Sequence, residues 1–214
     1  TKTWTCPLLP VVIKQIEEIG FLIDPKIKTF LKTKKKVPKI TKKDLGVLEE
    51  PRNYQLQGVK FIESKDGRCL LGDDTGIGKT FQAIAWMNYK GTYPAIVVCP
   101  SSLKYNWSNE IKRFLGKEAQ IISGYVDKDS KFTHDIVIIN YELLTDRKIK
   151  DKVVKGKKIK GKTYKGWKEK IRKHKFKLLI VDESQNIKNP TAKRSKAVIS
   201  ISKTVPYSIP MSAT

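Results

Sequence analysis

The chain has 214 residues, of which 39% are hydrophobic and 30% are charged, a balance typical of one soluble globular domain with a sizeable core. No apolar stretch approaches the roughly 18 residues that a membrane-spanning helix requires, and no segment has the layout of a secretion signal, so we expect no membrane partner. Lys and Arg number 44 against 21 Asp and Glu, a formal net charge of +23. This excess favours a nucleic-acid partner, because each cation that meets a phosphate releases condensed counterions. A lysine-rich coding bias is the alternative explanation.

Residues 1–50 differ from the remainder of the chain. Residues 10–19 have helical periodicity and end at Gly20, and residues 25–31 predict a second short helix. Residues 32–39 are basic and interrupted by proline. We interpret residues 1–50 as a small basic appendage and linker that joins the main domain near residue 50.

From residue 51 onward, apolar runs alternate with amphipathic segments. Near-continuous apolar runs of this kind are typical of strands buried on both faces of a parallel sheet. Strands are predicted at residues 68–71, 95–99, 120–122, 135–139, 177–181 and 207–211, with helices at 81–89 and 103–115. The alternation predicts an α/β domain over residues 51–214, with a mainly parallel sheet flanked by helices and with ligands at the carboxyl ends of the strands.

The cysteines form no CxxC pair, and Cys69 and Cys99 lie within predicted strands. This placement favours buried free thiols in a reducing compartment. We therefore expect an intracellular protein, which is cytoplasmic if its source is a bacterium or a phage.

One segment, at about residues 147–175, interrupts the alternation of strands and helices. It is dense in lysine, with a Lys-Gly rhythm at residues 155–156, 160–161 and 165–166. The pattern predicts an inserted β-hairpin followed by a helix through Trp167 and Ile171. Whether its lysines form a solvated surface or contact phosphates stays open, because a run of charge does not by itself define a binding face.

A glycine-bearing segment at residues 73–80, Asp-Asp-Thr-Gly-Ile-Gly-Lys-Thr, follows a predicted strand and opens a predicted helix. A phosphate cradle requires this context, since glycines let backbone N–H groups approach a phosphate and the helix N-terminus adds a positive dipole end. Lys79 can reach the β- and γ-phosphates of a nucleotide, and the hydroxyl of Thr80 can bind Mg²⁺. The strict form of the loop has glycine where this chain has Asp73.

Residues 178–183 form an apolar run that ends in two adjacent carboxylates, Asp182 and Glu183. In phosphate-loop NTPases an aspartate at a strand end holds Mg²⁺. We therefore expect Asp182 to hold Mg²⁺ and Glu183 to orient and deprotonate the attacking water. Two solvated carboxylates that cap a strand are the simpler interpretation of this pair alone, but the phosphate loop in the same sheet favours the catalytic one.

These motifs together resemble the Swi/Snf-related branch of the superfamily-two helicases over about residues 51–214. The segments that carry the resemblance are Arg52 to Gly58 (adenine recognition), Asp73 to Thr80 (phosphate loop), Val98 to Leu103 with Trp107 (motif Ia), Ile139 to Glu142 (motif Ib), Asp182 to Gln185 (motif II) and Met211 to Thr214 (motif III). In this family an aspartate at position 73 is expected, whereas Asp74 and Gln185 stand where glutamate and histidine are usual. Residues 4–7 are similar to a short stretch of the annealing-helicase-like branch.

The resemblance implies a RecA-like lobe that binds ATP and Mg²⁺ and hydrolyses ATP while tracking along duplex DNA. The implied nucleotide contacts are Gln55 on the adenine and Asp74, Thr75, Gly76, Gly78, Lys79 and Thr80 on the rest of the nucleotide; the catalytic residues are Lys79, Asp182 and Glu183, and the metal ligands are Thr80 and Asp182. The implied contacts to the tracked strand are Pro100, Ser101, Ser102, Lys104 and Tyr141, and the implied coupling residues are Gln185, Ser212 and Thr214.

Because the chain stops within motif III, we expect the second lobe and its arginine finger to be missing from it. Loss of an arginine finger costs about 10³–10⁵ in rate in related phosphoryl-transfer systems, so we expect weak nucleotide binding and little turnover from this lobe alone. Two alternatives stay open: an RNA or single-strand helicase of the same superfamily, and a non-catalytic nucleic-acid-binding module with a decayed nucleotide site. The second is disfavoured because Lys79, Thr80, Asp182 and Glu183 are all present.

Overall fold

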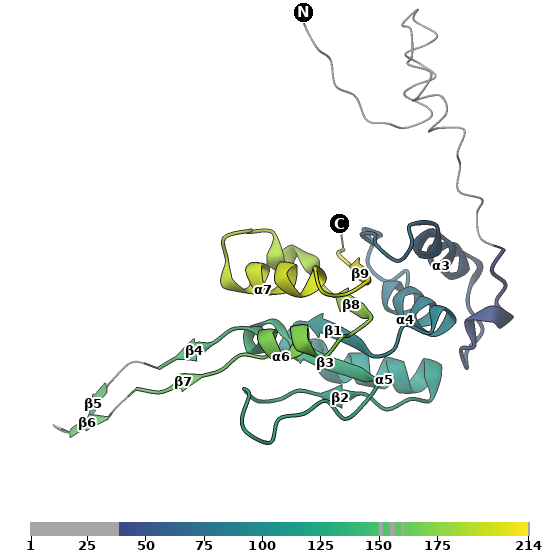
Figure 1. The fold of residues 1–214 in the computed structure, drawn as a ribbon. Coiled ribbons are helices and arrows are strands. Elements are labelled where there is room, and N and C mark those ends of the chain that lie inside the picture. The colour runs from purple at the N-terminus through teal and green to yellow at the C-terminus, as the bar shows by residue number, and fades with distance from the viewer. Residues whose placement is uncertain (1–38, 150–151, 155–156, 160, 214) are drawn as a thin grey trace, which may run out of the picture. The chain divides into compact units, whose positions relative to one another are not determined.

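In the computed structural model the chain separates into two units, residues 1–37 and residues 38–214. The structure describes residues 39–149, 152–154, 157–159 and 161–213, all of which belong to the second unit (Figure 1). The helices predicted at residues 10–19 and 25–31, the segment at residues 4–7 and the coupling residue Thr214 therefore lie outside the described residues.

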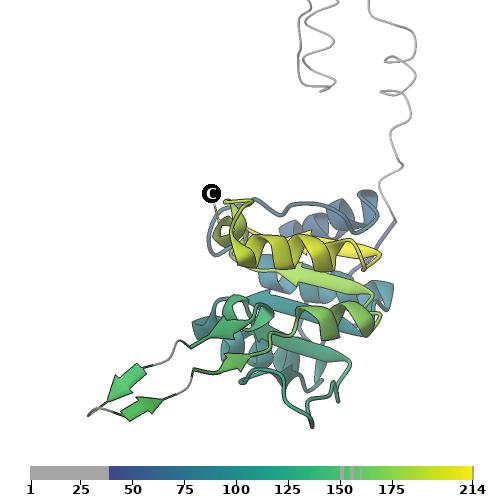
Figure 2. The same cartoon turned by 60° about the vertical axis from the view of Figure 1, so that its left-hand side comes forward.

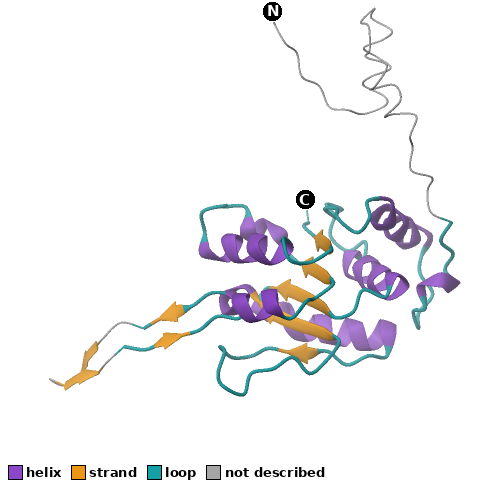
Figure 3. Cartoon of the chain, in the orientation of Figure 1, coloured by secondary structure: helices purple, strands orange, loops and turns teal. Residues whose placement is uncertain are grey.

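The centre of the described domain is a five-stranded sheet in which every strand pair is parallel, with the order β2-β3-β1-β8-β9 (Figure 3). Its strands are β1 (Ala95–Cys99), β2 (Gln120–Ile121), β3 (Ile136–Asn140), β8 (Leu178–Val181) and β9 (Tyr207–Pro210). The run predicted at residues 68–71 contributes only isolated parallel bridges beside β9. The predicted α/β architecture with a mainly parallel sheet is confirmed.

Helices cover both faces of this sheet (Figures 1 and 2). One face carries η1 (Lys43–Leu45), α3 (Asn53–Ser64), α4 (Lys79–Lys90) and α5 (Lys104–Leu115), and the other carries η3 (Tyr141–Leu144), α6 (Lys168–Lys173) and α7 (Lys193–Ser202). Successive residues of β1 alternate between the two cores, so that Val97 packs with the first set of helices and Val98 with the second. Burial on both faces explains why the strands are apolar throughout instead of alternating with polar residues.

Helices α3 and α7 are absent from the sequence-based prediction. Helix α3 begins with a capping box, in which the side-chain carbonyl of Gln55 accepts the Arg52 N–H at 2.9 Å. Helix α7 buries Ala197, Val198 and Ile201, but its first turn reads Lys-Arg-Ser-Lys. That polar start obscures the helical period of the three apolar positions that follow.

Residues 39–50 pack onto the domain. Ile40 and Leu45 are buried in its core, and the side-chain amide of Asn88 on α4 donates to the carbonyls of Leu45 and Gly46, each at 2.9 Å. The boundary between the two units therefore lies after residue 37, and not near residue 50 as the composition suggests. The reason is that Ile40 and Leu45, within the basic segment, belong to the core of the second unit.

The lysine-rich insertion forms antiparallel strand pairs followed by α6. Strand β4 (Arg147–Lys148) pairs with β7 (Thr163–Tyr164), and β5 (Lys152–Val154) pairs with β6 (Lys157–Ile159). Figure 1 shows these strands reaching away from the central sheet. The buried side chains of Trp167 and Ile171 anchor the insertion's end to the second core. Among the described residues, no helix combines the length and apolar character that a membrane crossing requires.

Candidate nucleotide-binding site

The predicted phosphate loop turns directly into α4. Gly76 and Gly78 have φ angles of +84° and +78°, a left-handed conformation that favours glycine. Gly78 is also the N-cap of α4, and a Cβ built there would lie 2.6 Å from Nε2 of Gln55. The backbone conformation therefore favours glycine at position 78, and a side chain there would also displace the end of Gln55.

Lys79 is the first residue of α4, and its ammonium lies within the loop. Its Nζ donates to the backbone carbonyls of Asp73 and Asp74. The N-cap residue makes no side-chain capping hydrogen bond, so the N–H groups of the first turn of α4 remain available to a ligand. A positive side chain beside a helix N-terminus is an arrangement that suits the phosphates of a nucleotide.

Asp182 follows β8, at the carboxyl edge of the sheet, and both of its carboxylate oxygens accept a hydrogen bond. Oδ2 accepts the indole N–H of Trp107 at 2.8 Å, and Oδ1 accepts the backbone N–H of Glu183 at 2.9 Å. Burial raises the pKa of Asp182, whereas these two hydrogen bonds and the charge of Lys79 oppose that rise. The phosphate loop and the acidic pair therefore act on each other electrostatically, although they are far apart in the sequence.

Glu183 adopts an unusual backbone conformation, with φ of +50° and ψ of +52°. A non-glycine residue held in the left-handed region costs about 1–3 kcal/mol and persists only where its surroundings enforce it. Here the next residue, Ser184, donates its N–H to the carbonyl of Met211 at 2.7 Å, and the side chain of Asn186 donates to the carbonyl of Glu183 at 3.0 Å. These bonds fix the turn that presents the Glu183 carboxylate.

Gln185 connects motif II to motif III. Its amide nitrogen donates to the carboxylate of Glu183, and its carbonyl oxygen accepts the hydroxyl of Ser212 at 2.9 Å. The side chain thus spans two segments that follow neighbouring strands, β8 and β9. The coupling role expected of Gln185 and Ser212 stays a prediction.

The loop and the acidic pair line one pocket of about 300 Å³. Its lining residues are Thr75, Gly76, Gly78, Lys79, Thr80, Leu103, Asn106, Glu110, Asp182, Glu183, Met211 and Ala213. Asn106 and Glu110 were not among the predicted site residues, and they lie four positions apart on one face of α5. Burial raises the pKa of Glu110, which the nearby Arg113 partly opposes. The sequence alone does not single them out, because Ser108 and Lys112, and Asn109 and Arg113, have the same i, i+4 spacing on α5.

The predicted strand-contacting residues other than Tyr141 follow directly after β1. Ser101 and Ser102 are exposed on η2 (Ser101–Leu103), directly after β1 and the half-buried Pro100. Lys104 is half-buried and donates to the carbonyl of Ile122 at 3.0 Å. The roles of these residues toward a nucleic acid stay predictions.

The phosphate contact expected from Tyr141 stays a prediction, but the side chain is held within the domain. The ring is only 2% exposed, and its hydroxyl donates to the backbone carbonyl of Asp182. Burial raises the pKa of Tyr141, so the hydroxyl stays protonated and remains a donor. Through this bond Tyr141 positions the end of β8.

The all-parallel sheet, the loop that opens α4 and the acidic pair at the end of β8 define a phosphate-loop NTPase domain of the RecA-like type. Residues 54–213 match the family model described as the SNF2-related domain. The chain belongs to this family, which confirms the resemblance that its motifs indicate.

Relatives and a solved structure agree with this assignment. The human protein named DNA annealing helicase and endonuclease ZRANB3 is 31% identical over 154 residues, which cover 69% of this chain and 13% of that protein. An uncharacterized ATP-dependent helicase of Mycoplasma pneumoniae is 29% identical over 161 residues, which cover 68% of this chain and 14% of that protein. The SWI2/SNF2 ATPase core of Sulfolobus solfataricus in complex with dsDNA matches with a TM-score of 0.60 and 26% identity, over 79% of this chain and 33% of that one. The chain thus spans only a small part of the length of these proteins.

Proposed function

We propose that this chain is the ATP-binding lobe of an SNF2-type motor, in which a second RecA-like lobe completes the catalytic site and ATP hydrolysis drives movement along duplex DNA. The observation that carries the proposal is the single pocket that Lys79, Thr80, Asp182 and Glu183 line together. The names of the relatives and the dsDNA complex of the Sulfolobus core support DNA as the partner. The formal net charge of +23 agrees with a polyanionic partner.

In this proposal the first turn of α4 and the ammonium of Lys79 bind the β- and γ-phosphates of ATP. The phosphate oxygens replace the Asp73 and Asp74 carbonyls that now accept from Lys79. Charge-assisted hydrogen bonds of this kind are roughly twice as strong as neutral ones. The interaction fixes the terminal phosphate beside the acidic pair.

The residues present fit a bound Mg²⁺. Thr80 and Asp182 line the same pocket, and hydroxyl and carboxylate oxygens are the hard donors that this cation prefers. Each oxygen of Asp182 accepts a single N–H, so lone pairs remain for a further partner. The ion would supply neutralisation of the phosphate charge, while Trp107 keeps the carboxylate oriented.

Glu183 would act as the general base, because it lines the same pocket as Lys79, which would hold the terminal phosphate. The bond from Gln185 holds that carboxylate and ties it to Ser212. A change at the terminal phosphate that moves Glu183 would therefore be transmitted to the segment after β9. This link gives the chain a physical route from nucleotide state to strand movement.

A second pocket, of about 510 Å³, lies beside the phosphate loop and suits the adenine base. It is lined by Tyr54, Gln57, Gly58, Phe61, Leu70, Leu71, Gly72, Asp73, Ile77 and Gln82. Aromatic and aliphatic walls of this kind are typical of sites for a planar ligand. Gln55 is not part of this lining, and the carbonyl of its side chain is occupied by the N–H of Arg52. Its role on the adenine therefore stays a prediction.

The choice of nucleic acid can be tested with the chain itself. We expect it to bind duplex DNA more tightly than single-stranded DNA or RNA of equal length at the same salt concentration. Steady-state ATP turnover should stay low with and without each nucleic acid, because the arginine finger comes from another lobe. Tighter binding of RNA or of a single strand would favour the alternative helicase. Vigorous DNA-stimulated turnover would contradict the need for a second lobe.

A further inference from the structure

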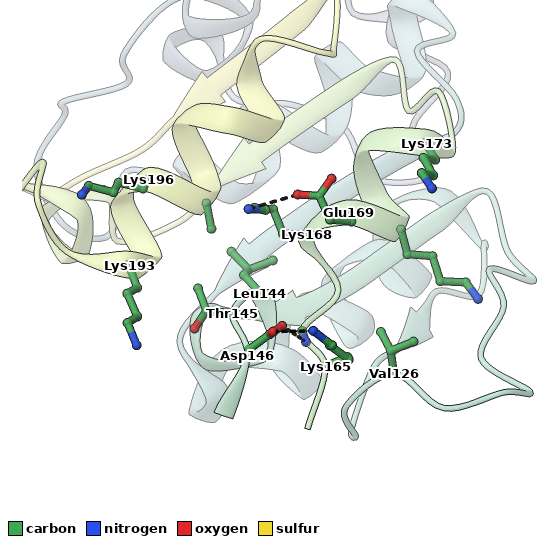
Figure 4. A pocket seen from close by; sticks show the side chains of 13 residues that line it. Val126, Leu144, Thr145, Asp146, Lys165, Lys168, Glu169, Lys173, Lys193 and Lys196 are labelled. Atoms are coloured by element: carbon green, nitrogen blue, oxygen red, sulfur yellow. Dashed lines mark hydrogen bonds and ion pairs between the residues drawn. The ribbon is translucent and has the colours of Figure 1, made fainter. Parts of the chain in front are cut away.

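Two adjoining grooves lie on the face of the domain that carries α6 and α7. Figure 4 shows the residues that line the first of them. The first, of about 690 Å³, is lined by Val126, Leu144, Thr145, Asp146, Lys165, Gly166, Lys168, Glu169, Lys170, Lys173, Lys193, Lys196 and Ala197. The second, of about 490 Å³, is lined by Tyr125, Tyr141, Glu142, Thr145, Asp146, Arg147, Lys148, Ala192, Lys193 and Arg194. Because Thr145, Asp146 and Lys193 line both, the two form one continuous track, which we call the stem groove.

The carboxylates of the first groove are already paired. Asp146 accepts Nζ of Lys165 at 3.1 Å and the N–H of Gly166 at 2.9 Å. Glu169 pairs with Lys168 at 3.0 Å and with Arg172 at 3.0 Å. Asp146 and Glu169 therefore neutralise Lys165, Lys168 and Arg172, and they do not pair with the other lysines of the first groove.

Three lysines of the first groove, Lys173, Lys193 and Lys196, are exposed and have no carboxylate within 4.0 Å in the part of the chain that the structure describes. Figure 4 shows them extended from α6 and α7, apart from the two ion pairs that are drawn. Lys193 and Lys196 are three positions apart, which places them on one face of α7. The groove thus presents two unneutralised cations on α7 and a third on α6 (Figure 4).

The stem groove adjoins the carboxyl edge of the sheet, where we expect nucleic acid to bind. Tyr141 and Glu142 of motif Ib line one end of the groove, and α7, which carries Lys193, follows motif II in the chain. The inserted hairpin leaves the domain from the same place, and residues 147–165 contain ten Lys and Arg against one Asp. Of these residues, Arg147, Lys148 and Lys165 line the stem groove.

The groove suits a polyanion with regular charge better than an acidic protein segment. Protein partners are usually anchored by large apolar or aromatic side chains in pockets. The exposed large hydrophobic side chains among the described residues are Leu48, Tyr54, Phe61, Leu70, Tyr105, Ile149 and Ile199, and none of them lines the stem groove. Lysine ammonium groups are compact point charges that bind phosphates without demanding a particular geometry.

We propose that the stem groove binds the phosphate backbone of duplex DNA and so adds contacts beyond those of motifs Ia and Ib. This inference rests on the proposed function, since it assumes that the same duplex crosses the carboxyl edge of the sheet. The contact is independent of base sequence and is electrostatic, because lysines on phosphates release counterions. It lengthens the stretch of duplex that the lobe covers.

The test compares two triple variants of the chain with equal change of charge. The first replaces Lys173, Lys193 and Lys196 with glutamine. The control replaces Lys43, Lys117 and Lys203, which are also exposed but line neither groove.

Binding of each variant to duplex DNA is measured over a series of salt concentrations. Each lost phosphate contact reduces the slope of log K against log salt by about 0.9, so we expect the groove variant to lose about 2–3 in slope and the control to lose much less. Equal slopes for the two variants would overturn the proposal.

Two further measurements separate the possible failures. ATP affinity should be the same in both variants, so a groove variant that binds ATP normally is folded. If the unsubstituted chain binds ATP but no duplex DNA, the proposed function fails together with the groove. If it binds duplex DNA and the groove variant matches the control, only the groove fails.

Reductive methylation of the unsubstituted chain gives a test that needs no variant. Bound duplex should protect Lys193 and Lys196 while Lys43 and Lys203 stay reactive. Polyglutamate of equal charge serves as the competitor. Protection of Lys193 and Lys196 by polyglutamate as strong as that by the duplex would overturn the proposal in favour of an acidic protein partner.

Discussion

Replacing Trp107 with phenylalanine removes one hydrogen-bond donor from the carboxylate that we assign to Mg²⁺. The indole N–H donates to Oδ2 of Asp182 at 2.8 Å, and the ring is 1% exposed, so water cannot readily take the donor's place. Loss of an outer partner of a metal-binding side chain typically lowers metal affinity by about 10–100-fold. We expect a loss of this size in the Mg²⁺-dependent part of ATP binding, together with a fall in stability of about 0.5–3 kcal/mol from the smaller ring.

Trp86 provides the matched control. It is also buried, and its indole N–H donates to Oε2 of Glu63 at 2.9 Å, but it does not line the nucleotide pocket. Calorimetric titration of ATP, with Mg²⁺ and with a chelator, gives the metal-dependent ratio of affinities for each variant. The ratio should fall in Trp107→Phe and be retained in Trp86→Phe. An equal fall in both, or an unchanged ratio in Trp107→Phe, would refute the positioning role of this hydrogen bond.

Three further predictions concern the loop, the link between motifs and the buried thiol. Gly78→Ala should weaken ATP binding, because a left-handed φ of +78° strains a side chain within the phosphate loop. Gly91→Ala has a similar strain, with φ of +63°, but lies outside the nucleotide pocket, so it should lose stability and bind ATP normally in the same titration. Gln185→Ala should lower stability by about 0.5–1.5 kcal/mol, or about 2–4 °C per kcal/mol in melting temperature, and leave ATP affinity nearly unchanged; a large loss of ATP affinity would show that the residue binds nucleotide directly. Burial raises the pKa of Cys99 to about 12, so at pH 9 its thiol stays protonated in the folded chain and should react with iodoacetamide only after unfolding, as peptide mass mapping would show. Labelling of the folded chain at that pH would contradict the burial.

The sequence is sufficient for features that depend on local patterns. Burial on both faces makes β1, β3 and β8 apolar along their whole length, so the runs identify the strands directly. The phosphate loop is recognisable because its glycines, its lysine and the helix that follows are contiguous. Asp182 and Glu183 are identified by their place at the end of an apolar run. The predicted core of the site therefore consists of residues whose role is set by their immediate neighbours in the chain.

The remainder of the site depends on contacts between distant segments. The bond from Trp107 to Asp182 joins residues 75 positions apart, and that from Ser212 to Gln185 joins residues 27 positions apart. No periodicity marks such pairs. Tyr141 was assigned to the ligand by its motif, but the turn after β3 directs its ring into the second core. The packing of Ile40 and Leu45 onto the domain is likewise hidden, since the surrounding lysines dominate the local composition.

The central claim, that the pocket around Lys79 and Asp182 binds ATP, is tested most directly by one calorimetric comparison. ATP is titrated into the chain and into its Lys79→Ala variant in the presence of Mg²⁺, and the melting temperatures of both are recorded. Hydrogen bonds to charged groups contribute about 1.5–3 kcal/mol, so we expect the variant to lose affinity by at least about tenfold. It should still unfold in one cooperative transition, at a temperature lowered only by loss of the bonds from Lys79 to the Asp73 and Asp74 carbonyls. Equal affinity of the two proteins for ATP would contradict the claim.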